Sequence, residues 1–220
     1  MNLSYKEKML YINVPYSEKD EAKKLGAWWD SQKKSWYVKR RKDYPKFYKW
    51  ILGNQEETFI LCDYFYIVEA MRKCYRCKRE TEVIGFGIEN FYILHDPKEY
   101  RDLYSWWDED IHMASYIDPM SDKLLDFLNR EYGYHMGYSK TVEDSYMANH
   151  CKYCNALQGD YFLFNEPDSP FCIDTIDDAR NLKLHKVKLE TDIIADVDMI
   201  WGSEDYLIKQ YAQKMRDISI

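Results

Sequence analysis

Four of the six cysteines form two Cys-x-x-Cys pairs, a spacing that suits metal binding. The pairs are Cys74 with Cys77 and Cys151 with Cys154. In a tight turn of this kind two thiolates converge on one ion while backbone amides point at the sulfurs, and two such turns complete a tetrahedral zinc site. Because four thiolates leave no coordination position for water, the predicted zinc ion is structural and activates no nucleophile.

The chain between the two pairs is long for a zinc ribbon. Between Cys77 and Cys151 lie 73 residues, whereas compact sites have spacers of about 15–20 residues. A helical insert between the two turns would explain the difference. Two alternatives stay open: one ion for each pair, with His150 or Cys172 completing the second site, or a redox-active pair. The second is disfavoured because neither pair has the βα context of a thioredoxin motif.

Positive charge surrounds the first pair. Arg76, Lys78 and Arg79 lie within it or directly after it, and Tyr75 lies between its cysteines. Such a tip can contact phosphates while the ring stacks on a base, so these four residues are candidate nucleic-acid ligands. The same cations could instead neutralise the negative charge of a zinc ion with four thiolates.

Two groups of carboxylates are candidates for acid–base or hard-cation chemistry. One lies in residues 106–112, with His112 at its end and Asp118 beyond it; the other comprises Glu190, Asp192, Asp196 and Asp198. Neither has a defined nuclease spacing, and solvated surface is the simpler interpretation. The sequence also lacks a phosphate-binding glycine loop and the common hydrolase motifs. A metal-dependent hydrolase that uses residues 108–118 is therefore only an alternative to a non-catalytic protein.

The elements that position these groups begin with a compact strand–helix–strand unit. A strand is predicted at residues 10–14 (LYINV). It should be followed by a helix that begins with Ser17 as its N-terminal cap and ends near Leu25. Gly26 suits the left-handed position after a helix, and residues 35–38 (SWYV) predict the second strand.

Residues 11–38 resemble a small domain of unknown function that accompanies plasmid conjugation primases of the TraC type and other mobile-element proteins. The resemblance lies in the motifs Val14-Pro15-Tyr16, Lys19-Asp20-Glu21-Ala22-Lys23, Leu25-Gly26-Ala27, Asp30 and Trp36-Tyr37. The family usually has Trp at the position of Trp29 and more often has Arg at that of Trp28, so this copy lacks one cation. The resemblance implies an association with DNA-handling proteins and supplies no catalytic residue.

The net charge of −7 is unevenly distributed. Residues 1–52 contain 13 Lys/Arg and six Asp/Glu, whereas residues 53–220 contain 18 and 32. We therefore expect a basic module, 1–52, and an acidic body, 53–220, with the boundary at 53–57. A basic module favours contact with a polyanion, although attraction between the two parts would use the same charges. The candidate phosphate ligands here are Lys33, Lys34, Lys39, Arg40 and Arg41, with Trp28 and Trp36 as candidate stacking partners.

The acidic body is expected to be rich in strands, which gives an α+β fold overall. Strands are predicted at 58–68, which contains Cys62 as a buried small side chain, and at 81–88. The insert between the cysteine pairs should contain a helix at 122–132 with Ser121 as its cap and Gly133 as its stop. Further expected elements are a helix near 44–52, a strand at 160–165, one or two strands within 182–197 and a closing amphipathic helix at 204–216.

Location and function follow from these features. No apolar run reaches the ~20 residues of a membrane span, and the first residues do not resemble a secretory signal, so a cytoplasmic protein with reduced cysteines is expected. The function predicted is that of a non-catalytic zinc-binding protein associated with nucleic acid, of bacterial or mobile-element origin. The leading alternative is a protein-binding module in phage defence or counter-defence, whose acidic body docks on a basic partner protein.

Overall fold

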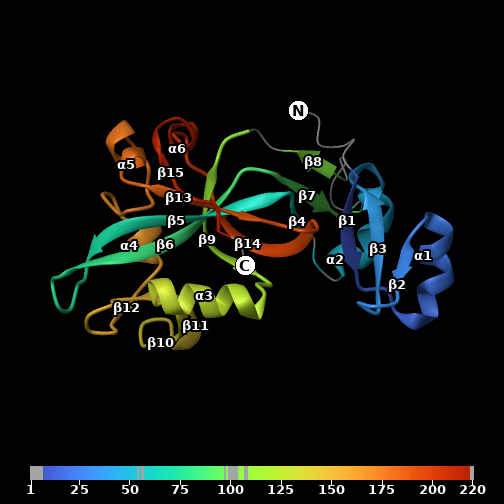
Figure 1. Cartoon of the computed structure of the whole chain (residues 1–220), viewed down its shortest axis with the longest axis horizontal. Helices are drawn as coiled ribbons and strands as arrows, with labels where there is room; N and C mark the ends of the chain where they lie inside the picture. The colour runs from blue at the N-terminus through green and yellow to red at the C-terminus, as the bar shows by residue number, and fades with distance from the viewer. Residues whose placement is uncertain are drawn as a thin grey trace. The chain divides into compact units, whose positions relative to one another are not determined.

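The computed structural model describes residues 7–218 except 54, 56, 97, 99–103, 107 and 108. The fold is α+β, as predicted, and the chain divides into two compact units (Figure 1). The first unit comprises Met1–Tyr64, Asn90–Asp108 and Leu189–Asp196; the second comprises Phe65–Glu89, Glu109–Lys188 and Val197–Ile220. The division at 53–57 stays a prediction, and the first unit includes two segments from later in the chain.

Three antiparallel strands open the first unit, in the order β1-β3-β2. They are β1 (Glu7–Ile12), β2 (Trp28–Asp30) and β3 (Ser35–Arg40), with the 3-10 helix η2 (Tyr16–Glu18) and α1 (Lys19–Leu25) between β1 and β2. Gly26 ends α1 with a φ of 102°, the left-handed conformation predicted from the sequence. The predicted cap was wrong, because Ser17 lies inside η2 and α1 begins without a side-chain cap.

The remaining elements of the first unit surround a shared apolar core. They are η3 (Arg41–Phe47), α2 (Tyr48–Leu52), β4 (Glu57–Leu61), β7 (Phe91–His95), β8 (Tyr104–Trp106) and the first half of β14 (Ile193–Ile200). β4 pairs antiparallel with both β7 and β14. The core joins buried side chains from the small sheet, such as Leu10 and Val38, to Ile60 of β4 and Leu94 of β7.

The central strands of the second unit are long and antiparallel. β5 (Tyr64–Lys73) pairs with β6 (Glu80–Ile88), which also pairs with β9 (His112–Asp118), and Figure 1 shows the β5–β6 hairpin extending from the sheet. On the other side of β5 lie β13 (Lys183–Lys188) and β15 (Gln213–Lys214). The single strand predicted at 58–68 was wrong: Asp63, with a φ of 62°, separates β4 from β5.

The insert between the cysteine pairs contains the predicted helix, α3 (Asp122–Tyr132). Ser121 caps it by accepting a hydrogen bond from the Leu124 amide at 3.3 Å, and Gly133 ends it with a φ of 66°. α3 packs against β6 and β10 (Figure 1). β10 (His135–Ser139) and β11 (Asp144–His150) form a hairpin, and β12 (Leu157–Gln158) pairs with β11 after the second cysteine turn.

Two predictions near the carboxyl end needed correction. The strand expected at 160–165 is the short helix α4 (Tyr161–Phe164), because the consecutive side chains of Leu163 and Phe164 are both buried and strand neighbours would point to opposite faces. The closing helix expected at 204–216 is shorter, α6 (Tyr206–Tyr211), because the chain becomes extended at Ala212 and continues into β15. Between α4 and α6, the helix α5 (Ile176–Arg180) begins with a capping box. No helix of the described residues is long and apolar enough to cross a membrane.

Candidate functional site

The two cysteine pairs converge at one point of the second unit. The Sγ atoms of Cys74 and Cys154 lie 3.7 Å apart, those of Cys77 and Cys151 lie 3.6 Å apart, and all four lie within 4.8 Å of one another. A tetrahedral ion with sulfur ligands at about 2.3 Å requires sulfur–sulfur distances of about 3.8 Å. The four thiols could therefore hold one metal ion, and the structure joins the two pairs in one site.

The two turns have the same backbone geometry. The amide of Lys78 donates to the Cys74 carbonyl at 2.9 Å, and the amide of Asn155 donates to the Cys151 carbonyl at 2.8 Å. Lys78 and Asn155 hold equivalent positions after their pairs, and both are left-handed, with φ values of 64° and 54°. Each pair is therefore presented by a tight turn whose shape comes from its own backbone.

Buried polar contacts fix the second turn against the first. The Asn149 side chain, at the end of β11, accepts a hydrogen bond from the Ile84 amide at 2.7 Å and donates one to the Ile84 carbonyl at 2.8 Å. It thereby pairs with β6 as another strand would. Beyond it, the Lys152 amide donates to Thr81 Oγ1 at 3.1 Å. These contacts explain how residues so distant in sequence meet at one site.

The electrostatics of the turns favour thiolates at part of the cluster. The Arg79 amide and side chain lower the pKa of Cys77 to about 6. Burial raises the pKa of Cys74, but amides of its own turn outweigh burial and lower it. The Ala156 amide lowers the pKa of Cys154, but burial and the other three thiols raise it to about 11. Protons are thus shared unevenly among the thiols, and a bound cation would displace them.

The candidate nucleic-acid ligands of the first turn are at the surface. Tyr75, Arg76, Lys78 and Arg79 are all exposed. The Arg79 guanidinium lies 4.1 Å from the ring centroid of Tyr153, a residue of the second turn that the sequence-based prediction missed. Arg79 also lowers the pKa of Cys77, so its positive charge acts on the thiols of the cysteine site. Arg76 and Lys78, in contrast, are exposed to solvent.

The candidates in the first unit fall into two groups. Lys33, Lys34, Lys39 and Arg40 are exposed, as a phosphate contact requires. Arg41 is not: its side chain is 0% exposed, so its assignment as a phosphate ligand was wrong. The sequence places it in a basic run, but η3 begins at Arg41 and directs the guanidinium inward.

Arg41 lies at the centre of a buried ionic cluster. Its Nε and Nη2 donate to the two carboxylate oxygens of Asp192 at 2.6 and 2.7 Å, and Nη2 lies 3.0 Å from Asp63 Oδ1. The Tyr44 hydroxyl donates to the same Asp192 carboxylate at 3.0 Å. Burial lowers the pKa of Arg41, but the two carboxylates outweigh burial and raise it. Cys62 is buried, as predicted, and burial raises the pKa of its thiol.

The small sheet has one apolar face and one aromatic face. Leu10, Ile12 and Val38 point into the core. Trp36 is on that side too and packs on Trp29, with ring centroids 5.5 Å apart, so it is not available as a stacking partner. The strand register places three aromatic side chains on the opposite face, where Tyr11 of β1 and Trp28 of β2 both pair with Tyr37 of β3. This row of three rings was not predicted, although alternation within 35–38 would have placed Tyr37 opposite Trp36.

The structure does not assemble the two carboxylate groups into a site. Residues 107 and 108 lie outside the described part of the chain. His112 is buried, with Nδ1 2.7 Å from Asp205 Oδ2, and Asp192 belongs to the Arg41 cluster. Within the described residues, the four cysteines are the one group of His, Cys, Asp or Glu side chains close enough together to hold a metal ion.

One carboxylic acid that the sequence did not single out is strongly perturbed. Burial and the nearby charge of Asp198 raise the pKa of Asp160 to about 7. Asp160 Oδ1 has no hydrogen-bond partner among the described residues, and the buried Tyr134 hydroxyl has none either. Asp198 itself accepts a hydrogen bond from Ser115 Oγ at 2.6 Å. The surroundings of Asp160 therefore favour its protonated form.

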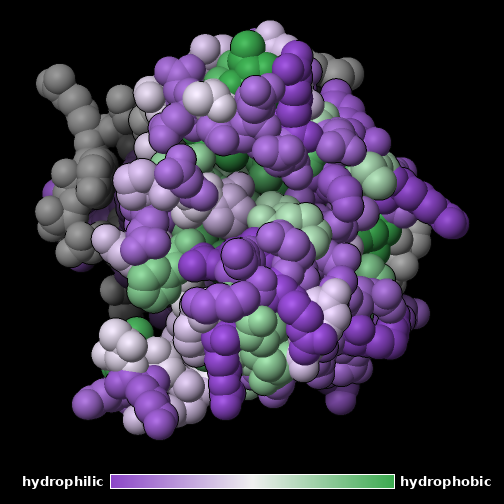
Figure 2. Space-filling model, turned by 90° about the vertical axis from the view of Figure 1, so that its left-hand side faces the viewer, coloured by the Kyte–Doolittle hydropathy of each residue, from purple (hydrophilic) through white to green (hydrophobic). Residues whose placement is uncertain are grey.

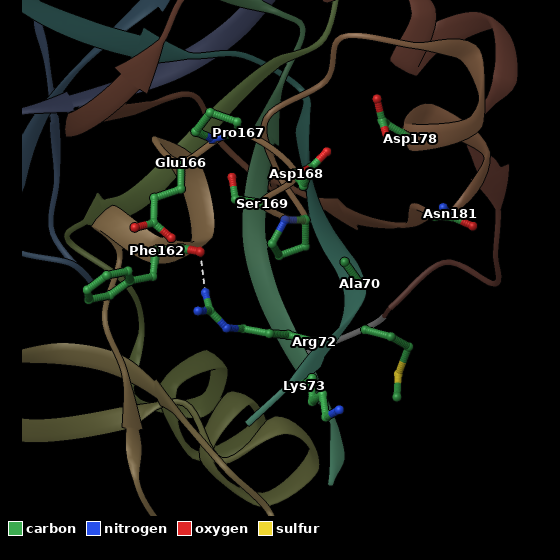
Figure 3. Close-up of a pocket in the computed structure, with 12 residues that line it drawn as sticks. Ala70, Arg72, Lys73, Phe162, Glu166, Pro167, Asp168, Ser169, Asp178 and Asn181 are labelled. Carbon is green, nitrogen blue, oxygen red and sulfur yellow. Dashed lines mark hydrogen bonds between the residues drawn. The ribbon is translucent and has the colours of Figure 1, made fainter. Parts of the chain in front are cut away.

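A hollow of about 570 Å³ in the second unit lies beside the end of β5. Figure 3 shows Arg72 reaching across it to donate a hydrogen bond to the Phe162 carbonyl. Lys73 adds a second cation, and Glu166 and Asp168 line the other side. On the face of this unit shown in Figure 2, hydrophilic residues predominate and hydrophobic ones form small separate patches. The hollow thus contains opposed charges, unlike the basic tip of the first cysteine turn.

Comparison with known proteins assigns the amino-terminal segment to a family of small domains. The chain is an α+β protein in which a small basic domain is combined with a four-cysteine site. Residues 9–51 match a family described as a domain of unknown function, DUF5710. This match confirms the small domain predicted from 11–38.

Two DNA primases TraC of Escherichia coli are similar to part of the chain. One is 63% identical over 43 residues and the other 51% identical over 45 residues, in each case 20% of this chain. These alignments cover 3% and 4% of the primases, so the similarity concerns a small domain and leaves most of both proteins unmatched. No solved structure matches the chain.

Proposed function

We propose that the protein is a non-catalytic, zinc-binding, nucleic-acid-associated factor of a mobile genetic element. The observation that carries the proposal is the exposed positive charge of the segment shared with DNA primases. Lys33, Lys34 and Lys39 are exposed there, whereas Arg41 is neutralised inside the unit. Cations placed at the surface beside aromatic rings are the groups that bind a phosphate backbone.

Zinc is the metal proposed for the four thiols. Four sulfur ligands select zinc or an iron–sulfur centre over harder ions, and a closed four-sulfur site is the usual structural zinc site. The ion would join the tip of the β5–β6 hairpin to the turn after β11. It would thereby hold Arg76 and Lys78 of the first turn at the surface of the second unit, where they could add phosphate contacts.

The test is nucleic-acid binding by the full chain at several salt concentrations. Fluorescence anisotropy with labelled single-stranded and duplex oligonucleotides should show an affinity that falls steeply between about 50 and 200 mM salt, because binding to phosphates releases counterions. The charge-reversing variant Lys33→Glu/Lys39→Glu should lower the affinity at least about tenfold.

A matched control is available in the same unit. Lys23 and Lys24 in the last turn of α1 are also exposed, so Lys23→Glu/Lys24→Glu makes the same change in net charge at another place. This variant should lose much less affinity. Absence of binding at low salt, or an affinity that does not depend on salt, would contradict the proposal.

A further inference from the structure

We propose that the outer face of the β1-β3-β2 sheet is a stacking platform for single-stranded nucleic acid. This inference rests on the proposed function and specifies the site and the ligand. The platform consists of Tyr11, Tyr37 and Trp28, one ring from each strand. It is separate from the cysteine site, which lies in the other unit.

The register places the three rings in one row across the sheet. Tyr37, in the middle strand, pairs with Tyr11 on one side and with Trp28 on the other. The centroids of the two tyrosine rings are 5.7 Å apart. Because adjacent strands are about 4.8 Å apart, the row is about 10 Å long. Trp28 is 54% exposed and the tyrosines are partly exposed, so two or three successive bases could stack on them.

The orientation of Tyr11 is fixed before any ligand binds. Its hydroxyl donates to Asp30 Oδ2 at 2.8 Å, and the other oxygen of Asp30 accepts from the amides of Gln32 and Lys33 at 2.9 and 3.1 Å. The hydrogen bond to Asp30 also raises the pKa of Tyr11 to about 12, so the hydroxyl remains a donor. A ring that is already oriented loses less conformational entropy when a base stacks on it.

Lysines lie over two members of the row. Lys39 Nζ is 3.5 Å from the Trp28 ring centroid, and Lys33 Nζ is 4.5 Å from the Tyr11 centroid. Such contacts are weak at exposed positions, so a base can displace the ammonium groups from the rings. The lysine chains are flexible, and each displaced ammonium can then pair with a phosphate of the same strand.

A hollow beside Trp28 adds room for the backbone of the strand. Its volume is about 260 Å³, and Lys39, Arg40 and Lys46 contribute its cations. Asp43, also in its lining, pairs with both Arg40 and Lys46, so the net charge of these groups is positive. A phosphate group next to the base on Trp28 would meet this charge.

These features select single strands over duplexes. In a duplex the faces of the bases are covered by their neighbours, whereas a single strand can turn its bases outward onto aromatic rings. The row contains stacking surfaces and cations but no group placed to recognise one particular base. The expected binding is therefore tolerant of sequence and sensitive to salt.

The experiment compares binding of the full chain to labelled oligo(dT), oligo(U) and a blunt duplex of the same length. The wild-type chain should bind one or both single strands at least about tenfold more tightly than the duplex. Loss of one base–aromatic stack typically weakens binding about 5- to 150-fold. Trp28→Ala and Tyr37→Ala should each lie in this range, while Trp28→Phe should retain most of the affinity because it keeps a ring.

Trp29→Ala is the matched control. Trp29 is the next residue of β2 and is 52% exposed, but it belongs to the opposite face, where it packs on Trp36. A second control, Tyr16→Ala, removes a ring that is 82% exposed in η2. Both variants should bind oligo(dT) as the wild type does. The melting temperature of every variant is measured alongside, so that lost binding is compared only among folded proteins.

Two failures are distinguishable. If the wild type binds in a salt-dependent manner but folded Trp28→Ala and Tyr37→Ala bind oligo(dT) with unchanged affinity, the platform is wrong and the proposed function stands. Tighter binding of the duplex than of either single strand also overturns the platform alone. If the wild type binds none of the three probes at low salt, both proposals are wrong.

Discussion

The pKa of Asp160 depends strongly on the surroundings of this side chain. Burial of its carboxyl group and the charge of Asp198 together raise the pKa of Asp160 from its ordinary value near 3.8 to about 7. In the unfolded chain the same group ionises near its ordinary pKa. Between about pH 4 and pH 7 the folded state therefore binds more protons than the unfolded state, and stability falls as pH rises through this range.

The variant Asp160→Asn tests this sign. Asparagine cannot ionise, so the variant should be more stable than the wild type at pH 8 and differ little at pH 4. Thermal unfolding of both proteins between pH 4 and pH 8 gives stability as a function of pH for each. In the difference between the two, the contributions of the other titrating groups cancel. A difference that does not change with pH would contradict the raised pKa.

The Arg41 cluster leads to a second prediction at the scale of single residues. Replacing Arg41 by alanine leaves the Asp192 carboxylate buried without its bidentate partner, and breaking a buried ion pair in this way costs about 3–5 kcal/mol. Urea denaturation of Arg41→Ala should show such a loss of unfolding free energy. The neighbouring Arg40 is exposed, and its partner Asp43 also pairs with Lys46, so Arg40→Ala is the control and should cost about 1 kcal/mol or less. Equal losses in both variants would show that the buried cluster adds nothing.

The two arginines also show what the sequence could reveal. The cysteine pairs were predictable because the two ligands of each turn are close in sequence and their chemistry is specific. Arg41 was misassigned because its partner, Asp192, is 151 residues away, and no local pattern indicates such a pairing. Trp28 was proposed as a stacking partner, but the row that it forms with Tyr37 and Tyr11 required the strand register.

At the scale of elements, local signals predicted those helices and strands whose ends depend on nearby residues. α3 was predicted with both ends because Ser121 and Gly133 act within one turn of it. Elements that depend on tertiary packing were predicted poorly. In residues 160–165 the aromatic composition favours a strand, but packing of Leu163 and Phe164 on the same side produces a helical turn.

At the scale of elements, we predict that the two cysteine turns bind one zinc ion together. The purified protein should contain about one zinc ion per chain by elemental analysis. Cys77→Ser and Cys151→Ser should lose it, and a chelator should lower the melting temperature of the wild type, because an ion that binds only the folded state stabilises that state. Retention should decrease as pH falls, since protons compete for the thiolates.

Cys172→Ser is the control for metal content. Cys172 lies outside the four-thiol group, so the variant should keep the metal of the wild type. A wild-type protein without bound zinc, or a Cys77→Ser variant that retains a full equivalent, would contradict a shared site.

At the scale of the whole molecule, the segment similar to TraC primases is smaller than the unit in which it folds. The match ends at residue 51, whereas the core of the first unit also contains Ile60, Tyr92 and Ile194. The family match alone could not reveal these additions, because they lie outside residues 9–51.

A fragment of residues 1–52 tests this dependence. It lacks both carboxylate partners of Arg41 and part of the apolar core, so it should show no cooperative thermal transition by circular dichroism. The full chain under the same conditions should unfold cooperatively. Cooperative unfolding of the fragment would show that the module is independent of its later segments.

The pairing of Arg41 with Asp192 also has a consequence for biosynthesis. Protein synthesis adds about 5–20 residues per second, so the 151 residues between the two side chains take roughly 8–30 s to emerge. During this interval the nascent first unit has an arginine that belongs inside it and no Asp192 to receive it. Completion of this unit must therefore await the synthesis of Asp192, long after Arg41 has emerged.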